Sequence, residues 1–535
     1  MKDLRDVAAG LGLAEDDVET RGSHAKVRLS AAGDVTGPRG KYVLVTAMSP
    51  DKAGIGKTVT SIGLAMGLRR TGATAAVTLR QSSLGPTLGM KGGGAGGGVA
   101  GIVPLEHSLL GLGEDLHAVE SANNLLAAAV DDAIFRGADV DPATVTWRRV
   151  LDVDDRALRR VTVRPDGTAD GAARETGFDI TAASEVMAVL ALATDLGDLQ
   201  DRLGRIVPAW TRDGRPVTAR DLRADGAMAV LLKDALMPNL MQTTDGTPAL
   251  LHAGPFGNIA TGCSSVVADR VALPSVDYVV TEAGFGSDLG AEKLVHLKSP
   301  VLGVHPDAAV LVVTLRALRS HGGGIDAPDV AAVEKGCDNL RRHLGILEVL
   351  GVPAVVALNS FPGDSAEETE VVLAAARAAG VRAVLSEPYT RGADGSLALA
   401  EAVAEACGDT PPHGVPLPRD ADVAEKVRTL ATRVYGADDV LWSPQATDKL
   451  DLLTATGYGQ LPVCIAKTHL SLSADPKLVG APTGFDLPVR DLRLAAGAGF
   501  VTVYAGDIMT MPGLPSSARF QQVRLDDSGE VVGLV

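Results

Sequence analysis

The sequence predicts an α/β protein built on a parallel sheet, with two smaller α/β domains beside the main one. The first observation behind this prediction is a series of short apolar runs separated by helix-length segments, which is typical of strands buried on both faces of a parallel sheet. The second is the composition: 46% of the residues are hydrophobic but only 3% are aromatic, so small aliphatic side chains must fill the core. The third is a Gly-Lys-Thr turn that closely follows one of the apolar runs.

Each apolar run ends at a glycine, a proline, an asparagine or a charged residue. The expected strands are 43–47, 75–79, 249–253, 278–281, 309–313 and 354–358. In open parallel sheets the residues that bind ligands follow the carboxyl ends of the strands. This rule places Glu282, Arg316 and Asn359 at one edge of the sheet, together with Lys57 and Arg80.

The turn at residues 54–58 is the first candidate binding site. Gly56, Lys57 and Thr58 fit the end of a Walker A motif, although Asp51 stands where that motif has its first glycine. Backbone N–H groups at the start of the following helix favour phosphate there. We therefore predict a P-loop-type nucleotide domain in which Gly54, Gly56, Lys57 and Thr58 bind the phosphates of ATP and Thr58 also contacts the Mg²⁺ that ATP carries.

A second glycine tract spans residues 91–98 and begins with Lys91, Gly92 and Gly93. Ordering so many glycines costs entropy, which a chain accepts mainly where its backbone must approach a ligand closely. We predict that this tract contacts the nucleotide or its co-substrate. A flexible loop without any binding role is the alternative.

The chain divides into three expected domains. Residues 1–340 form the nucleotide domain, whose first 40 residues are a short helical lead-in and a polar linker. Residues 341–416 form a second α/β domain, and a proline-rich turn region at 409–416 separates it from a C-terminal α/β domain at 417–535.

Composition and charge narrow the class of protein. The net charge of −16 argues against a nucleic acid partner, because phosphate backbones require basic surfaces. The cysteines form no CxxC pair, and we interpret them as free thiols in a reducing compartment. The N-terminus has no apolar signal segment and the apolar runs are too short to span a membrane, so we expect a cytoplasmic protein.

Beyond these motifs, longer stretches of the sequence resemble the formate–tetrahydrofolate ligase (formyltetrahydrofolate synthetase) family. The resemblance extends from about residue 40 to residue 535. The stretches that carry it are 89–98, 147–152, 174–181, 226–234, 281–293, 312–323 and 507–515.

The resemblance implies a three-domain subunit that assembles as a homotetramer and acts on small molecules. It implies an ATP-dependent C–N ligase that first phosphorylates formate to formyl phosphate and then transfers the formyl group to N10 of tetrahydrofolate, its co-substrate. Lys57 would hold the ATP phosphates, Arg80 would bind formyl phosphate, and Asp115 is the third catalytic candidate. Phe361 and Tyr389 would stack on folate, whereas packing in the core is their alternative role. The family also suggests a monovalent cation, for which no residue here indicates a ligand.

Several positions depart from the family pattern, and they gather in stretches expected to contact substrate. These departures are Ile55 for glutamate, Gln81 for glutamate, Ser82 for proline, Val99 for tyrosine, Leu109 for asparagine, Gly111 for histidine, Glu114 for glycine and Thr261 for histidine. Two alternatives to formate ligation therefore remain open. One is a divergent ATP-dependent ligase that activates another acid or uses another amine acceptor. The other is a non-catalytic homologue that binds nucleotide.

Overall fold

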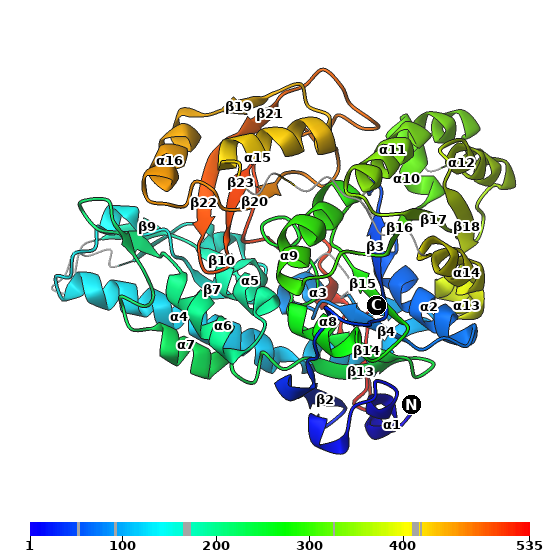
Figure 1. Ribbon diagram of the computed structural model, residues 1–535, viewed down its shortest axis with the longest axis horizontal. Coiled ribbons are helices and arrows are strands. Elements are labelled where there is room, and N and C mark those ends of the chain that lie inside the picture. Colours follow the sequence, from blue (N-terminus) through cyan, green and yellow to red (C-terminus); the bar gives the residue numbers. More distant parts are fainter. Residues whose placement is uncertain are drawn as a thin grey trace.

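A computed structural model describes residues 1–50, 54–89, 94–163, 173–324, 327–408, 417 and 420–534 (Figure 1). Lys91, Gly92 and Gly93, three of the predicted contacts, lie outside this described part, as does Asp51. The α/β class is confirmed, because a large sheet rich in parallel strands lies at the centre with helices packed around it.

The described residues form a central 12-stranded sheet. Its main path runs through β1 (Val18–Arg21), β2 (His24–Val27), β13 (Asn239–Thr243), β14 (Pro248–Leu251), β4 (Ala75–Leu79), β15 (Tyr278–Glu282), β3 (Lys41–Ala47), β16 (Ala308–Val313), β17 (Ala354–Asn359) and β18 (Arg382–Ser386). All neighbours from β14 to β18 are parallel, as the apolar runs predict. β6 (Ala100–Val103) branches from β13 and pairs with β5 (Gly96–Gly97).

The prediction for residues 1–40 was wrong in one respect. α1 (Leu4–Ala9) is helical, but β1 and β2 form an antiparallel hairpin that joins the sheet at β13. These two strands have only four residues each and contain Glu19, Arg21 and Lys26, so no apolar run marks them. Their place in the sheet depends on contacts with distant parts of the chain.

The described residues of the predicted second domain, 341–408, form no sheet of their own. Their strands β17 and β18 pair with β16 and so extend the central sheet, and the expected boundary at residue 340 falls inside a helix, α11. Helices around these strands and the rest of the sheet are α2 (Lys57–Arg70), α3 (Leu84–Leu88), α8 (Val266–Ala272), α9 (Ser299–Leu302), α10 (Leu315–Gly322), α11 (Val330–Val349), α12 (Ala366–Ala378), α13 (Pro388–Arg391) and α14 (Leu397–Ala406).

Two lobes lie one above the other on the left side of Figure 1, next to the sheet. The helical lobe contains α4 (Gly113–Phe135), β7 (Arg149–Leu151), β8 (Val161–Val163), β9 (Arg174–Thr176), β10 (Phe178–Ile180), α5 (Glu185–Leu192), α6 (Leu196–Arg205), β11 (Ala209–Trp210), β12 (Pro216–Val217) and α7 (Asp225–Leu232). The C-terminal lobe contains α15 (Val423–Leu430), β19 (Val440–Trp442), α16 (Pro444–Ala455), β20 (Val463–Ala466), β21 (Leu487–Val489), β22 (Asp491–Ala495) and β23 (Phe500–Tyr504). Near the end of the chain, β24 (Arg524–Leu525) pairs with β25 (Val531–Val532).

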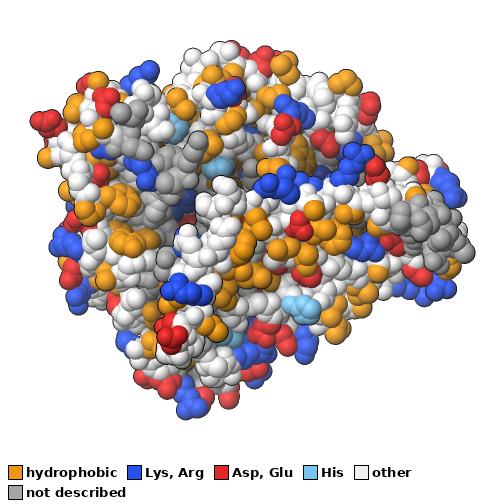
Figure 2. Space-filling model, turned by 180° about the vertical axis from the view of Figure 1, so that it is seen from behind, with side chains coloured by type: hydrophobic (Ala, Val, Ile, Leu, Met, Phe, Trp, Pro, Cys, Tyr) orange, Lys and Arg blue, Asp and Glu red, His pale blue; other side chains and the backbone are white. Residues whose placement is uncertain are grey.

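The surface carries charges of both signs. On the face shown in Figure 2, lysine and arginine side chains are interspersed with aspartate, glutamate and hydrophobic side chains. None of the helices in the described part of the chain combines the length and the apolar character needed to cross a membrane.

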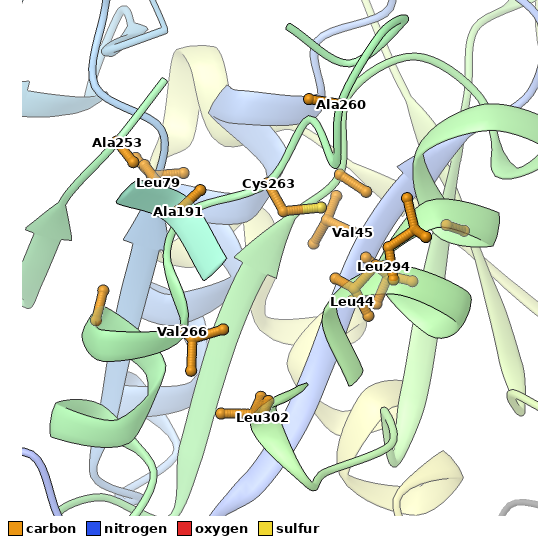
Figure 3. Packing of buried hydrophobic residues seen from close by; sticks show 14 of the residues in the cluster. Leu44, Val45, Leu79, Ala191, Ala253, Ala260, Cys263, Val266, Leu294 and Leu302 are labelled. Carbon is orange, nitrogen blue, oxygen red and sulfur yellow. The ribbon is translucent and has the colours of Figure 1, made fainter. Parts of the chain in front are cut away.

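The core is built from aliphatic side chains on the parallel strands. Figure 3 shows Val45 of β3 beside Cys263, Leu44 of β3 beside Leu294, and Leu79 of β4 beside Ala253, all of them buried. α2 packs closely against the segment 388–396 because two of its positions that face this segment, Gly63 and Gly67, are glycine. A β-carbon at Gly63 would lie 2.4 Å from the side chain of Pro388, at the start of α13. The sequence thus allows α2, which begins at the predicted phosphate loop, to lie directly against α13.

Glu185 makes the stability of the fold depend on pH. Its Oε1 accepts hydrogen bonds from the N–H groups of Gly497 (2.7 Å) and Ala498 (3.4 Å), which joins the helical lobe to the turn between β22 and β23. Burial raises the pKa of Glu185 from 4.5 to about 7. A raised folded-state pKa favours the fold below the unfolded pKa, and this contribution is lost as the pH rises through 7.

Glu185→Gln keeps both hydrogen bonds but removes this titration. Between pH 4.5 and pH 8 we expect the unfolding free energy of the variant, relative to the parent protein, to increase by about 3 kcal/mol. Urea unfolding of both proteins at several pH values measures the difference. A difference that stays constant with pH would contradict the assignment.

Candidate functional site

The predicted site residues follow neighbouring parallel strands at the carboxyl edge of the sheet. Arg80 follows β4, Glu282 ends β15, residues 54–56 lie between β3 and α2, which begins at Lys57, and Asn359 ends β17. Because β15 lies between β4 and β3, the strands that lead to Arg80 and to the loop are about 10 Å apart. The expected placement of Glu282, Arg316 and Asn359 beside the loop is confirmed by the hydrogen bonds below.

The loop is held by its carbonyl groups. Nη2 of Arg316 donates to the Gly54 carbonyl at 3.3 Å, and Nδ2 of Asn359 donates to the Ile55 carbonyl at 3.2 Å. In a planar trans peptide the N–H points away from the C=O, so the N–H groups of Ile55 and Gly56 face the opposite side. Gly56 has a φ of +82°, and a β-carbon there would lie 2.3 Å from Asn359 Nδ2. Glycine is therefore required at this position on two grounds.

Lys57 and Thr58 open α2, whose positive dipole end favours an anion beside them. The Thr58 hydroxyl donates to Oε2 of Glu282 at 2.6 Å. A hydroxyl and a carboxylate are hard oxygen ligands of the kind that Mg²⁺ uses together with substrate phosphates, so this pair fits the predicted Mg²⁺ contact. Among the residues that the structure describes, no group of three or more His, Cys, Asp or Glu side chains could hold a metal by itself.

Arg80 lies beside the turn that follows β15. Its Nη1 donates to the Pro255 carbonyl at 3.3 Å, and a β-carbon at Gly284 would lie 3.4 Å from its Nη2. Glu282 precedes this turn, so the carboxylate bonded to Thr58 lies on the strand between Arg80 and the loop. The guanidinium therefore lies at the same edge of the sheet as Lys57.

Asp115 lies in a buried polar cluster. Its carboxylate accepts from Lys26 Nζ at 2.5 Å and from Asn239 Nδ2 at 2.7 Å. Gln81 joins the cluster, because its Nε2 donates to the Leu112 carbonyl at 2.5 Å and its Oε1 accepts from Asn239 at 3.4 Å. Burial raises the pKa of Asp115. Any catalytic role for Asp115 would have to operate from its ion pair with Lys26. The cluster is connected to Arg80 through Gln81, which directly follows Arg80 in the sequence.

Comparison with known proteins identifies the family. The family model described as formate–tetrahydrofolate ligase matches residues 1–535. The chain belongs to the formate–tetrahydrofolate ligase family. Among its relatives, the formate–tetrahydrofolate ligase of Saccharopolyspora erythraea is 50% identical over 550 residues, which cover 100% of this chain and 97% of the relative. That of Myxococcus xanthus is 51% identical over 547 residues, with 100% and 99% covered.

Two departures from the formate–tetrahydrofolate ligase pattern, Ser82 and Leu109, line a cavity of about 170 Å³. Its other walls are mainly leucines from the start of α4 and the segments before it, and three ionisable side chains also line it. The lining residues are Ser82, Leu84, Leu109, Leu110, Leu112, Gly113, Leu116, His117, Glu120 and Asp152. In this ligase family member the cavity is therefore largely apolar. It lies close to Arg80 in the sequence, because Ser82, which lines it, is two residues after Arg80.

The two predicted folate-stacking residues of this formate–tetrahydrofolate ligase family member are exposed. Phe361 is 47% exposed and Tyr389 is 55% exposed, so neither is packed in the core. They follow the neighbouring strands β17 and β18 at the same edge of the sheet. The described part of the glycine tract reaches Tyr389: a β-carbon at Gly97 would lie 3.2 Å from its ring, and the Val99 N–H donates to its carbonyl at 2.9 Å. Close backbone approach explains glycine here.

The sequence did not indicate two buried residues that contact the site, the partner of Asp115 and a histidine beside Ser49. Lys26 was absent from the expected site although it is fully buried, because no apolar run marks the strand that carries it. His343, whose imidazole contacts Ser49 just before the loop, was also missed, because helix α11 gives no sign of which strand it covers.

Proposed function

We propose that this protein joins formate to N10 of tetrahydrofolate at the expense of ATP, which gives 10-formyltetrahydrofolate, ADP and phosphate. The match to the formate–tetrahydrofolate ligase family along the whole chain, with relatives about 50% identical in full length, carries the proposal. The geometry of the loop after β3 supports its first step.

In the first step, a formate oxygen attacks the γ-phosphorus and the bond to the β-phosphate oxygen breaks, so ADP leaves and formyl phosphate forms. Lys57 would neutralise charge on the transferred group, while Thr58 and Glu282 would contact Mg²⁺ carried by ATP. Arg80 would bind the carboxylate and then formyl phosphate, because a guanidinium can donate two parallel hydrogen bonds.

In the second step, N10 of tetrahydrofolate attacks the formyl carbon. The C–O bond to phosphate then breaks, and N10 passes its proton to the phosphate that leaves. Arg80 would stabilise the charge on the leaving phosphate. The exposed rings of Phe361 and Tyr389 support binding of the flat folate ring system at the neighbouring strand ends.

An assay of purified protein with ATP, Mg²⁺ and formate, with and without tetrahydrofolate, tests the proposal. We expect formation of ADP and 10-formyltetrahydrofolate in equal amounts when all substrates are present. Saturable ATP binding without turnover would instead identify a non-catalytic homologue.

Activation of a larger acid is a second candidate function, and the leucine-lined cavity favours it. An acid panel of formate, acetate, propionate and butyrate discriminates the two by the rate of ADP release. If the cavity holds an acyl chain, butyrate is the better substrate and Leu110→Asn lowers its rate selectively. If formate is the substrate, ADP release is fastest with formate.

Removing one aromatic ring tests the folate contact. We expect Phe361→Ala and Tyr389→Ala each to raise the KM for tetrahydrofolate about three- to tenfold, with the KM for ATP unchanged, since stacking is worth about 0.5–1.5 kcal/mol beyond burial. Tyr389→Phe keeps the ring and serves as the control. Equal KM values for tetrahydrofolate in all these proteins would contradict stacking.

The homotetramer implied by the family is part of the proposal. Exposed hydrophobic side chains on the helical lobe support a protein contact there, among them Phe135 on α4 and Val230 and Leu231 on α7. Light scattering of the purified protein measures the assembly, for which we expect four times the subunit mass of 54.9 kDa.

A further inference from the structure

Ser49 lies two residues before the start of the loop segment 51–58, and both polar groups of its backbone contact histidines. Its N–H donates to Nε2 of His343 on α11 at 2.9 Å, and its carbonyl lies 3.0 Å from Nε2 of His321 on α10. All three residues are buried. With Asn339 and Gly480 they form what we call the Ser49 cluster.

The backbone hydrogen bonds fix the tautomer of each histidine. A peptide N–H can only donate, so Nε2 of His343 accepts from Ser49 and the proton lies on Nδ1, which is 2.7 Å from the Ser287 hydroxyl. The Gly480 N–H donates to Nδ1 of His321 at 3.0 Å, so the proton of His321 lies on Nε2, where it is donated to the Ser49 carbonyl. Both imidazoles therefore act as neutral groups, and burial lowers the pKa of His343 to about 4.

The Ser49 cluster connects three parts of the molecule. Asn339 Nδ2 donates to the Gly480 carbonyl at 2.7 Å, so both backbone groups of Gly480 in the C-terminal lobe are bonded to this cluster. Helix α10 contributes twice: His321 contacts Ser49, while Arg316 one turn and a half earlier contacts Gly54 beyond residues 51–53. One helix thus contacts the chain on both sides of residues 51–53.

We propose that His321 and His343 are positioning residues for nucleotide binding, which fix the entry of the phosphate loop through the backbone of Ser49. In addition, His321 ties that entry to the C-terminal lobe at Gly480. This inference rests on the proposed function, in which residues 54–58 bind ATP. It predicts that His321 and His343, which are not among residues 54–58, affect the affinity for ATP but not the affinity for any other substrate.

Two amide substitutions separate the two bonds of His321. Glutamine places a donor near the position of imidazole Nε2, so His321→Gln keeps the bond to Ser49 and loses Gly480. Asparagine places an acceptor near the position of Nδ1, so His321→Asn keeps Gly480 and loses Ser49. The same substitutions separate the two bonds of His343. His343→Gln retains an acceptor for the Ser49 N–H, whereas His343→Asn retains the contact with Ser287.

Calorimetric titration with a non-hydrolysable Mg–ATP analogue, and separately with tetrahydrofolate, tests the proposal. We expect His321→Asn and His343→Asn to weaken ATP binding about tenfold, and the two glutamine variants to weaken it less than about threefold. The affinity for tetrahydrofolate stays unchanged, and thermal melting reports the folded state of each variant. If one pair fails to fold, the pair at the other histidine carries the test.

Equal ATP affinities for the asparagine and glutamine variants would overturn the inference, as would an equal loss of tetrahydrofolate affinity. Lys57→Ala distinguishes this failure from failure of the proposed function. If the parent protein and Lys57→Ala bind the analogue equally, or neither binds it, the loop assignment is wrong and the inference falls with it.

Discussion

Lys57→Ala is expected to lower the rate of ADP formation by about a hundred- to a thousandfold, the usual loss when a positioned donor to a charged transition state is removed. Lys57 is the first residue of α2, after a glycine with positive φ, so its position relative to the helix N-terminus is set by the backbone. Its ammonium would meet the phosphoryl group where negative charge accumulates during transfer.

The matched control for this variant is Lys335→Ala, which removes an exposed lysine from α11. We expect that control to retain full activity, so that a change in net charge alone has no effect. A steady-state assay of ADP release with saturating formate measures both proteins. Normal turnover by Lys57→Ala would exclude residues 54–58 as the ATP phosphate site.

Arg80→Lys is expected to lower kcat/KM for formate about a hundredfold while the KM for ATP changes less than about threefold. Lysine keeps the positive charge but cannot donate two parallel hydrogen bonds to a carboxylate or to a phosphoryl group. The position of Arg80 after β4, two strands from the loop, makes its effect separable from nucleotide binding.

Arg70→Lys provides the control, because Arg70 forms an exposed ion pair with Asp394 at 3.1 Å and exposed pairs contribute little. Initial rates over a matrix of formate and ATP concentrations give both constants. If Arg80→Lys instead raises the KM for ATP without lowering kcat/KM for formate, Arg80 binds the nucleotide and not the acid.

The parallel part of the sheet was predictable because its strands are buried on both faces. Residues 75–79 are β4 as expected, and β15 and β17 differ from the expected strands only by one residue at the carboxyl end. Since the ends of such strands share an edge, the positions of Glu282 and Asn359 beside the loop followed from the same pattern.

Contacts between distant segments could not be predicted. Lys26 and Asp115 are 89 residues apart, and Ser49 and His343 are 294 residues apart. Each polar residue is stable in the interior only because its partner is there, and neither segment alone indicates that partner. The hairpin at the edge of the sheet was missed for the same reason.

The close packing of Gly63 against Pro388 has a consequence for how the two halves of the reaction communicate. Helix α2 starts at Lys57, and Pro388 directly precedes Tyr389. Because Gly63 has no side chain, α2 packs directly on the Pro388 ring, and we expect a displacement of α2 by bound ATP to shift the Tyr389 ring as well. If ATP binds at the start of α2 and folate stacks on Tyr389, as proposed, then nucleotide binding would change the affinity for the pterin and would favour an ordered addition of substrates.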